Sequence, residues 1–295
     1  MSVQARVPRL LVTIPHFFKE GSDSRYGSGR EKAAHRVNAI RRCITALHQS
    51  LGSRQAVIQV GDRVTHPVRP VQRVELDIVV CTAGDNHLLA GLEGLFSQER
   101  TGIADPMLLG YECQRAMKER AGRYDWYAYM EDDLIVTDPW FLAKLAWFQR
   151  HAGAGALLQP NRFEIAGGPL HKLYLDGDFS ETFVRQFLPR EQETELKANF
   201  LDVDVRLVRA RNPHAGAYFL TAGQLEYWMG RTSFLDYETS FFGPLESAAT
   251  FGVMRTFQTY KPHMDNAAFL EIQHHGNTFM SYVGTKFPMQ DELSA

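Results

Sequence analysis

The chain has 295 residues, of which 44% are hydrophobic, 22% charged and 12% aromatic, and this composition excludes a disordered or collagen-like protein. Lys and Arg number 32 against 34 Asp and Glu, giving a formal net charge of −2, so no basic excess indicates a nucleic-acid partner. No apolar run reaches the ~20 residues that a membrane-spanning helix needs. The cysteines Cys43, Cys81 and Cys113 are widely spaced, which favours reduced, buried thiols. We therefore expect a cytoplasmic protein without a transmembrane segment, although contact with the inner face of a membrane through a lipid substrate would leave no such mark.

The first third of the chain alternates short apolar runs with an amphipathic segment. Residues 10–14 form an apolar run that stops at Pro15, and a Gly/Ser-rich stretch follows at 21–29, which predicts a buried strand and then a loop. Apolar residues at three- and four-residue steps predict a long helix over 30–51. Runs rich in β-branched residues predict two further strands, at 56–58 and 76–81.

The alternation continues to residue 152. Asp105 and Pro106 have the pattern of an N-cap followed by a first-turn proline, and the helix that they begin should end near Gly122. A strand predicted at 126–130 leads into three consecutive carboxylates, and Asp138-Pro139 begins another helix. Strands that alternate with helices predict an α/β fold with a mostly parallel sheet flanked by helices, whose ligands bind at the carboxyl ends of the strands.

Beyond residue 152 the pattern changes to shorter segments separated by glycines. A strand predicted at 217–220 is followed by Thr221 as a helix cap, and Gly243-Pro244 begins a helix whose first turn contains Glu246. A last strand is predicted at 269–273. These segments predict an α+β lobe, and we divide the chain into halves at 1–152 and 153–295, packed as one continuous domain.

The acidic triplet Glu131-Asp132-Asp133 lies between apolar and aromatic residues. Three carboxylates at the end of a buried strand repel one another and lose hydration unless a cation binds there. In an extended segment Glu131 and Asp133 project to one side and Asp132 to the other, so the first and third can direct oxygens at one hard cation. The alternative is an acidic surface turn between two strands, but the position after a hydrophobic strand favours metal binding.

The layout of residues 8–150, together with Glu131-Asp132-Asp133, resembles the glycosyltransferases of the A fold. In that superfamily an acidic motif of the D-x-D type ends a strand of a Rossmann-like, nucleotide-binding sheet and holds Mn²⁺ or Mg²⁺ against the diphosphate of a nucleotide sugar. The resemblance implies a nucleotide-sugar donor bound by residues 1–152 and a hydroxyl-bearing acceptor bound by residues 153–295. Glu replaces the first Asp of the motif here, so Asp133 is the safest metal ligand, and Glu131 can act indirectly through water or the ribose.

The same resemblance implies where the donor lies. Thr13, Pro15 and His16 would lie beside the base and ribose, together with Asp85 in the loop after the strand predicted at 76–81, while Glu131 and Asp132 would complete the site. An aspartate after a strand is, however, more often a cap or turn residue than a ribose ligand. The stretch 21–29 fits either a surface loop or a lid that the substrate orders.

In the second half the resemblance implies a carboxylate base in inverting members of the superfamily. Glu246 fits that role, Asp236 and Glu238 are its rivals, and helix capping explains Glu246 equally well. A retaining reaction would need no such base.

The resemblance also implies a histidine near the end of the catalytic domain as a further metal ligand. Alternation places His274 on the side of Leu270 and Ile272, as in a core histidine, and this slightly favours His275. Arg36, Arg41 and Arg42 on the first predicted helix are explained most simply by a solvated helix face.

The sequence thus predicts a metal-dependent glycosyltransferase that uses Mn²⁺ or Mg²⁺ and a nucleotide sugar. Two alternatives stay open. A sugar nucleotidyltransferase also uses an α/β sheet and an acid-bound metal, although its usual Gly-rich signature after the first strand is poorly matched here. A non-catalytic carbohydrate-binding protein could use the aromatic residues and a structural cation.

Overall fold

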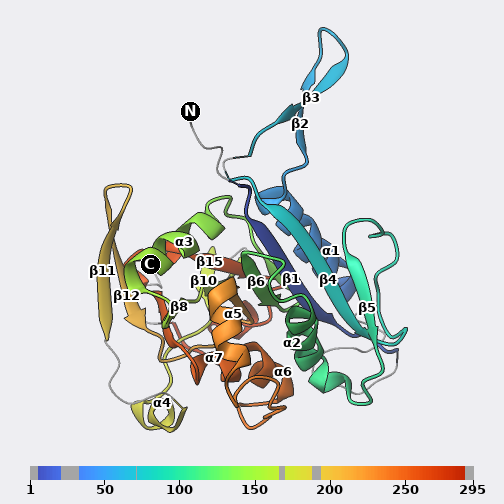
Figure 1. The fold of residues 1–295 in the computed structure, drawn as a ribbon. Helices are drawn as coiled ribbons and strands as arrows, with labels where there is room; N and C mark the ends of the chain where they lie inside the picture. The colour runs from blue at the N-terminus through green and yellow to red at the C-terminus, as the bar shows by residue number, and fades with distance from the viewer. Residues whose placement is uncertain (1–5, 21–32, 71, 166–169, 188–193, 290–295) are drawn as a thin grey trace.

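A five-stranded sheet lies at the centre of the fold in the computed structural model, which describes residues 6–20, 33–70, 72–165, 170–187 and 194–289 (Figure 1). Its strand order is β13-β6-β1-β4-β5. β6, β1, β4 and β5 are parallel neighbours, whereas β13 pairs antiparallel with β6. The strands of this sheet are β1 (Arg9–His16), β4 (Glu75–Ala83), β5 (Ser97–Thr101), β6 (Trp126–Met130) and β13 (Ala217–Thr221).

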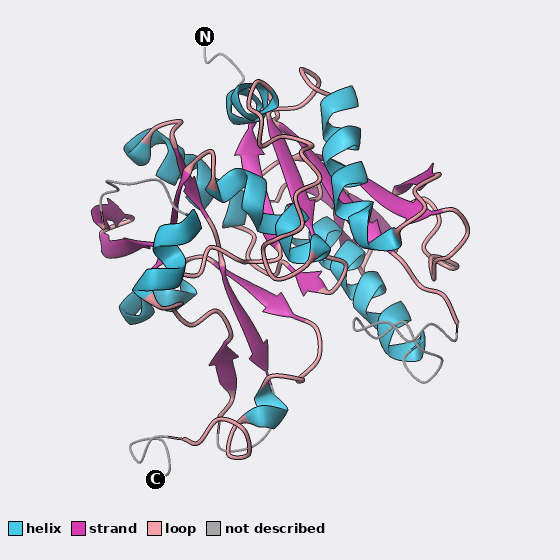
Figure 2. Cartoon of the chain, turned by 90° about the horizontal axis from the view of Figure 1, so that it is seen from below, coloured by secondary structure: helices cyan, strands magenta, loops and turns pink. Residues whose placement is uncertain are grey.

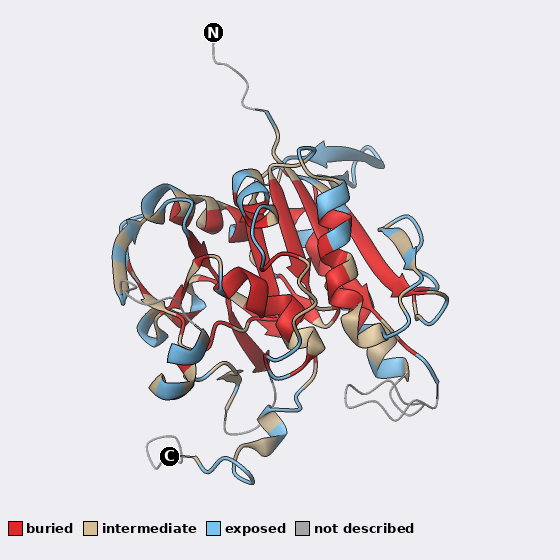
Figure 3. Ribbon diagram, turned by 60° about the horizontal axis from the view of Figure 1, so that its bottom comes forward, coloured by how far each residue is buried: buried red, intermediate tan, exposed pale blue. Residues whose placement is uncertain are grey.

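Helices cover both faces of the central sheet, as Figure 2 shows from below. One face packs against α1 (Ala33–Leu51) and α3 (Phe141–Ala152), and the other against α2 (Leu109–Glu119) and α5 (Ala222–Met229). In β1, Leu10 and Val12 belong to the first core layer and Leu11 to the second, because neighbouring side chains of a strand project to opposite faces. Strands β1, β6 and β13 are therefore buried on both faces, whereas the edge strand β5 is not (Figure 3).

Two smaller four-stranded sheets complete the body, with orders β10-β9-β15-β7 and β11-β12-β14-β8. The pairs β9–β15 and β8–β14 are parallel, and the other pairs are antiparallel. Their strands are β7 (Leu134–Ile135), β8 (Ala156–Leu158), β9 (Asn161–Ile165), β10 (Lys172–Tyr174), β11 (Glu195–Phe200), β12 (Val203–Arg209), β14 (Gln258–Pro262) and β15 (Glu271–His274).

A two-stranded hairpin projects from the body at the top of Figure 1; it consists of β2 (Gln55–Gln59) and β3 (Val64–Val68). The remaining helices are short. They are η2 (Pro106–Leu108), α4 (Glu181–Phe187), α6 (Pro244–Glu246), the π-helix η3 (Ser247–Phe251), α7 (Gly252–Met254), η4 (Met264–Phe269) and η5 (Met280–Tyr282).

Most of the predicted elements are confirmed. The strand predicted at 126–130 is β6, and the side chain of Asp105 accepts a hydrogen bond from the amide of Met107 as an N-cap. Thr221 caps α5 in a capping box with Gln224. The long first helix is described from Ala33, and the stretch 21–29 lies outside the described residues. The three cysteines are buried and unbonded, as expected.

The α/β class is confirmed, but the mostly parallel arrangement holds only for the central sheet. The two smaller sheets are chiefly antiparallel: two of their antiparallel pairs join consecutive strands, and two join strands that are far apart in the chain. Strand β13, from the second half of the chain, forms an edge of the central sheet, and the functional division at residue 152 stays a prediction. No helix in the described part of the chain has the length and apolar character that crossing a bilayer requires.

Candidate functional site

A cavity of about 640 Å³ lies at the carboxyl ends of β1, β4, β5 and β6. This is the edge where parallel α/β sheets bind their ligands, and the volume suits a nucleotide-sized molecule. One part of its wall is polar and contains Arg36, Glu131 and Asp132. The rest is chiefly apolar, and its residues are Pro15, Phe17, Lys19, Ala83, Gly84, Asn86, Thr101, Gly102, Ile103, Ala104, Pro106, Met107, Leu109, Tyr129 and Leu245.

The residues predicted to hold the donor divide into two groups. Pro15, like Glu131 and Asp132, lines the cavity. Thr13 does not line it, because its buried hydroxyl donates a hydrogen bond of 3.0 Å to the carbonyl of Ala128 across the β1–β6 pair. It therefore supports the strands behind the cavity.

His16 and Asp85 also lie outside the cavity lining. His16 is fully buried, with its Nδ1 2.5 Å from Asp132 and its Nε2 accepting a hydrogen bond from the amide of Leu88. The side chain of Asp85 is 79% exposed and forms an ion pair of 2.9 Å with Arg100. The neighbours of Asp85, Gly84 and Asn86, face the cavity instead.

The three carboxylates lie in a turn between β6 and β7 and not in the extended segment that was predicted, although Asp132 does point away from the other two. Asp132 points toward His16 and Arg36, whereas the carboxyl groups of Glu131 and Asp133 lie toward β9 and β15. Burial opposes the ionisation of Asp132, but the charge of Arg36 and the hydrogen bond from His16 outweigh it and hold the pKa of Asp132 below its usual value. Asp132 is thus a buried, ionised partner for His16 of β1 and Arg36 of α1.

The solvated role predicted for Arg36 is wrong. Its side chain is only 18% exposed and contacts Asp132 at 2.5 Å, with Asp133 at 3.9 Å. These two carboxylates keep the guanidinium on the protein side of α1, next to the cavity. Arg41 and Arg42, in contrast, are exposed.

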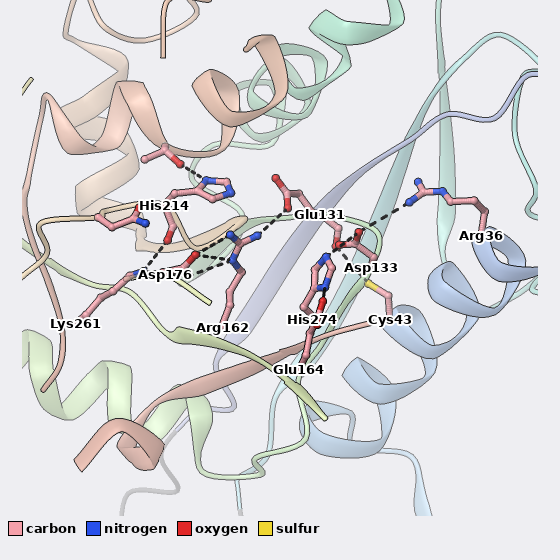
Figure 4. A network of polar contacts seen from close by, with 12 residues as sticks. Arg36, Cys43, Glu131, Asp133, Arg162, Glu164, Asp176, His214, Lys261 and His274 are labelled. Atoms are coloured by element: carbon pink, nitrogen blue, oxygen red, sulfur yellow. Dashed lines mark hydrogen bonds and ion pairs between the residues drawn. The ribbon is translucent and has the colours of Figure 1, made fainter. Parts of the chain in front are cut away.

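Asp133 and His274 face each other across the β7–β15 pair (Figure 4). The Nε2 of His274 lies 3.6 Å from Oδ2 of Asp133, and Nδ1 forms a hydrogen bond of 3.0 Å with Glu164. Burial opposes protonation of His274, but Glu164 and Asp133 outweigh it and raise its pKa. Glu164 also accepts a hydrogen bond from the amide of Met280. A carboxylate behind an imidazole in this way fixes the orientation of the ring.

His275 lies differently from His274, although the sequence slightly favoured it as the ligand. Its ring packs against that of His35, with 4.7 Å between the ring centres. Its amide donates a hydrogen bond of 2.7 Å to the carbonyl of Asp133, and burial lowers the pKa of its imidazole. His275 therefore contacts the backbone of Asp133, and His274 contacts the carboxylate.

Glu131 lies at the junction of the cavity and a buried charge network. Its Oε2 is 3.9 Å from Nη1 of Arg162. Burial, and then the charge of Asp133, raises the pKa of Glu131 to about 8. The neutral form of Glu131 is therefore favoured relative to that of an exposed glutamate.

The network beyond Glu131 was not predicted from the sequence (Figure 4). Asp176 receives a hydrogen bond of 2.7 Å from Arg162 and one of 3.1 Å from Lys261. Lys261 also donates to the carbonyl of His214, whose ring forms a hydrogen bond with Thr250 in the π-helix. The sequence signal was the placing of Arg162 and Glu164 two residues apart in β9, which puts both side chains on one face.

The candidate catalytic carboxylates lie in different surroundings. Asp236 forms an ion pair with Arg255, and Glu238 accepts hydrogen bonds from the amides of Thr239 and Ser240. The carboxyl groups of Asp236 and Glu238 are therefore engaged in contacts that stabilise the loop to which they belong. Glu246 ends α6 directly after Leu245, which lines the cavity, and its charge acts on Glu131.

The described residues form no group of three or more His, Cys, Asp or Glu side chains arranged to hold a metal ion. Two of the four predicted ligands do come together, namely Asp133 and His274. In addition, Oδ1 of Asp133 is buried and has no hydrogen-bond partner in the described structure, which is costly unless a cation or water binds there. An acid oxygen and an imidazole nitrogen fit part of the donor set of Mn²⁺ or Mg²⁺, and substrate and water oxygens would have to supply the rest.

No family model and no curated protein sequence matches the chain. Among solved structures, one similar chain is in the crystal structure of GalNAc-T7 with UDP, GalNAc and Mn²⁺, with a TM-score of 0.46 and 10% identity, covering 92% of this chain and 44% of that chain. Another is in the crystal structure of S. aureus TarS, with a TM-score of 0.44 and 9% identity, covering 94% of this chain and 38% of that chain. Both of these proteins are glycosyltransferases. The chain thus spans less than half the length of each.

Proposed function

We propose that this chain is a metal-dependent glycosyltransferase that moves a sugar from a nucleotide-sugar donor to a hydroxyl acceptor. The observation that carries the proposal is the position of Asp133 and His274 beside the acidic end of the cavity, with one buried oxygen of Asp133 unpartnered. A buried carboxylate of this kind is stabilised by a cation, and a cation there suits a diphosphate.

The apolar part of the cavity would hold the base of the nucleotide. Phe17, Ile103 and Met107 provide apolar surface at the carboxyl ends of the strands, and planar bases pack well against such surface. Arg36 lies at the polar end, where its charge would favour the diphosphate. Neither contact distinguishes one nucleotide base from another.

Asp133 and His274 would hold Mn²⁺ or Mg²⁺, with Glu164 orienting the imidazole. When bound, the ion supplies positive charge that offsets the charge developing on the diphosphate leaving group. Glu131, which lines the cavity and whose pKa is raised by burial and by the charge of Asp133, would contact the donor through its ribose or through water. Asp132 would act indirectly, by holding Arg36 at the cavity wall.

Glu246 is our candidate for the base that accepts the proton of the acceptor hydroxyl. It follows Leu245 of the cavity wall and comes from the half of the chain to which we assign the acceptor. This role applies only to a reaction that inverts the anomeric carbon. The assignment of residues 1–152 to the donor and 153–295 to the acceptor, and the cytoplasmic location, are parts of the same proposal.

Incubation with UDP-, GDP-, CMP- and dTDP-sugars in the presence of Mn²⁺ tests the class of activity. A glycosyltransferase releases the nucleotide from its cognate donor slowly with water and faster with an acceptor, and chelation stops the release. A carbohydrate-binding protein releases none. A sugar nucleotidyltransferase instead forms pyrophosphate from a nucleoside triphosphate and a sugar phosphate, so either of these results would contradict the proposal.

A further inference from the structure

The hairpin β2–β3 is exposed along its whole length. Residues 56–69 are all exposed, and the loop that contains them is closed at its base by a bridge between Gly52 and Val74 (Figure 3). Its large aliphatic side chains are unusually accessible: Ile58 is 71% and Val60 80% exposed. An isolated two-stranded hairpin gains little stability in water, so an exposed apolar hairpin indicates an interaction surface.

One face of this hairpin combines aliphatic and cationic side chains. Ala56 pairs with Pro67, and Ile58 with Thr65, so these four residues lie on one face, and Val60 and Arg63 belong to the turn at the tip, next to this face in the chain. Arg54 directly precedes β2 and Arg69 directly follows β3, so the same alternation places both of these residues on this face. Gln55, Val57, Gln59, Val64, His66 and Val68 form the opposite face.

The charge of this segment differs from that of the rest of the chain. Residues 54–73 contain four arginines and one aspartate, a charge of +3, although the whole chain carries −2. None of these arginines forms an ion pair within the described residues. Unpaired cations beside exposed aliphatic side chains are complementary to a surface that is anionic outside and apolar just beneath.

We propose that the face of the hairpin formed by Ile58, Val60, Arg54, Arg63 and Arg69 docks on an anionic phospholipid bilayer. The aliphatic side chains would enter the boundary between head groups and acyl chains, and the long arginine side chains would reach the phosphates. A second copy of this chain fits poorly, because pairing two hairpins would bring six arginines together against only two aspartates, one Asp62 from each tip. This inference does not depend on the proposed transferase activity.

The position of the hairpin agrees with such docking. It precedes β4, whose first residue Glu75 lies near the base of the hairpin and whose last residue, Ala83, lines the cavity. A strand of nine residues spans roughly 25 Å. Figure 1 shows the hairpin beyond one end of β4, and Ala83 of the cavity lining is the last residue at the other end of this strand, so a chain docked by its hairpin keeps the cavity open to water.

Co-sedimentation with vesicles tests the proposal on the full chain. We expect binding to vesicles of phosphatidylglycerol and phosphatidylcholine in equal parts, little binding to pure phosphatidylcholine, and weaker binding as salt rises. The triple variant R54Q/R63Q/R69Q should bind about fivefold more weakly for each arginine, roughly 100-fold in all. The variant I58S/V60S should lose about tenfold without any change of charge.

Two control variants separate this face from general effects. R41Q/R123Q/R150Q removes three exposed arginines elsewhere, which form no ion pairs in the described structure, and should stay within about twofold of the unaltered chain. V57S/V64S alters the opposite face and should have a small effect. Melting temperatures of all variants verify that the body is folded.

Three results would overturn the proposal. Equal losses of vesicle binding in R54Q/R63Q/R69Q and R41Q/R123Q/R150Q would show that only the overall charge of the chain matters. Equal losses in I58S/V60S and V57S/V64S would show that no single face docks. Absence of binding by the unaltered chain to anionic vesicles at low salt would also reject a bilayer and leave an acidic protein surface as the occupant of this face.

Discussion

Gly216 provides the surface against which the carboxyl group of Glu131 packs. The backbone of Gly216 has φ of +60°, and a Cβ at this position would overlap the carboxyl group of Glu131. The carbonyl of Gly216 also accepts a hydrogen bond of 2.9 Å from the amide of Glu131. The placing of an acidic residue at the end of β6 therefore depends on a glycine just before β13, in the other half of the chain.

Substitution of Gly216 by alanine should displace the carboxyl group of Glu131. Left-handed backbone costs an alanine roughly 1–2 kcal/mol, and the overlap adds to this. Gly122 is the control, because its φ is +78° but nothing lies within 4 Å of a Cβ there. We expect G216A to lose most donor turnover and to melt lower than G122A. Equal turnover in the two variants would show that the position of Glu131 is unimportant.

Asp132 and Asp133 should respond differently to the loss of charge. D133N removes the carboxylate that faces His274, so it should abolish metal-dependent nucleotide binding while the chain remains folded. D132N leaves Arg36 without its closest carboxylate and should lower the free energy of unfolding by up to roughly 3 kcal/mol. Metal titrations and denaturant unfolding of both variants measure these effects. A D133N variant with normal metal binding would contradict the site.

The raised pKa of His274 predicts opposite pH effects with and without metal. Protonated His274 is stabilised by Glu164 and Asp133, so without metal its contribution to stability is fully present below the ordinary histidine pKa of about 6.5. This contribution is lost as pH rises through the raised pKa of the folded chain. Metal needs the neutral imidazole, so metal-dependent stabilisation should be lost as pH falls through the same range.

Variants of His274 and His275 identify which imidazole causes the two pH effects. H274A should remove both pH effects, whereas H275A should leave them, because His275 contacts only the backbone of Asp133. E164Q removes one of the charges that raise the pKa of His274, so metal-dependent stabilisation should persist to lower pH. Melting curves across pH, with and without Mn²⁺, measure all of these. A pH dependence that survives in H274A would assign it to another group.

Glu246 can be tested as a base against its role in the first turn of α6. E246Q should lower turnover by roughly 10² to 10⁴ while donor and metal affinity stay near normal. Capping loss predicts the reverse, with a destabilisation of ~1 kcal/mol and little change in turnover. E238Q is the control, since Glu238 fixes its own loop. Normal turnover in E246Q would favour a retaining reaction or another base.

The central sheet could be predicted because its signals are local. The run 126–130, the N-cap at Asp105 and the capping residue Thr221 each act within a few residues of the chain. The smaller sheets depend instead on long-range pairing, such as β9 with β15. Nothing in a single short strand specifies such a partner.

The candidate site was predictable only in part for the same reason. Strand alternation predicted that Asp132 points away from Glu131 and Asp133, but in the structure a turn between β6 and β7 produces these directions. The choice of His274 over His275 depends on Glu164, a buried acid from another strand that compensates for a histidine on the core side of β15. The prediction that Arg36 lies on a solvated helix face was wrong because helix periodicity does not reveal that the buried carboxylate of Asp132 lies beside this face.

Thermal melting with nucleotides tests the central claim most directly. The unaltered chain and D133N would be melted with UDP, GDP, CMP or dTDP, each with and without Mn²⁺. We expect one nucleotide to raise the melting temperature of the unaltered chain by roughly 5 °C or more at saturating concentration, only with Mn²⁺ present. D133N should melt cooperatively and show no such rise. Stabilisation that is independent of Mn²⁺, or that is undiminished in D133N, would contradict a metal and nucleotide-sugar site at Asp133.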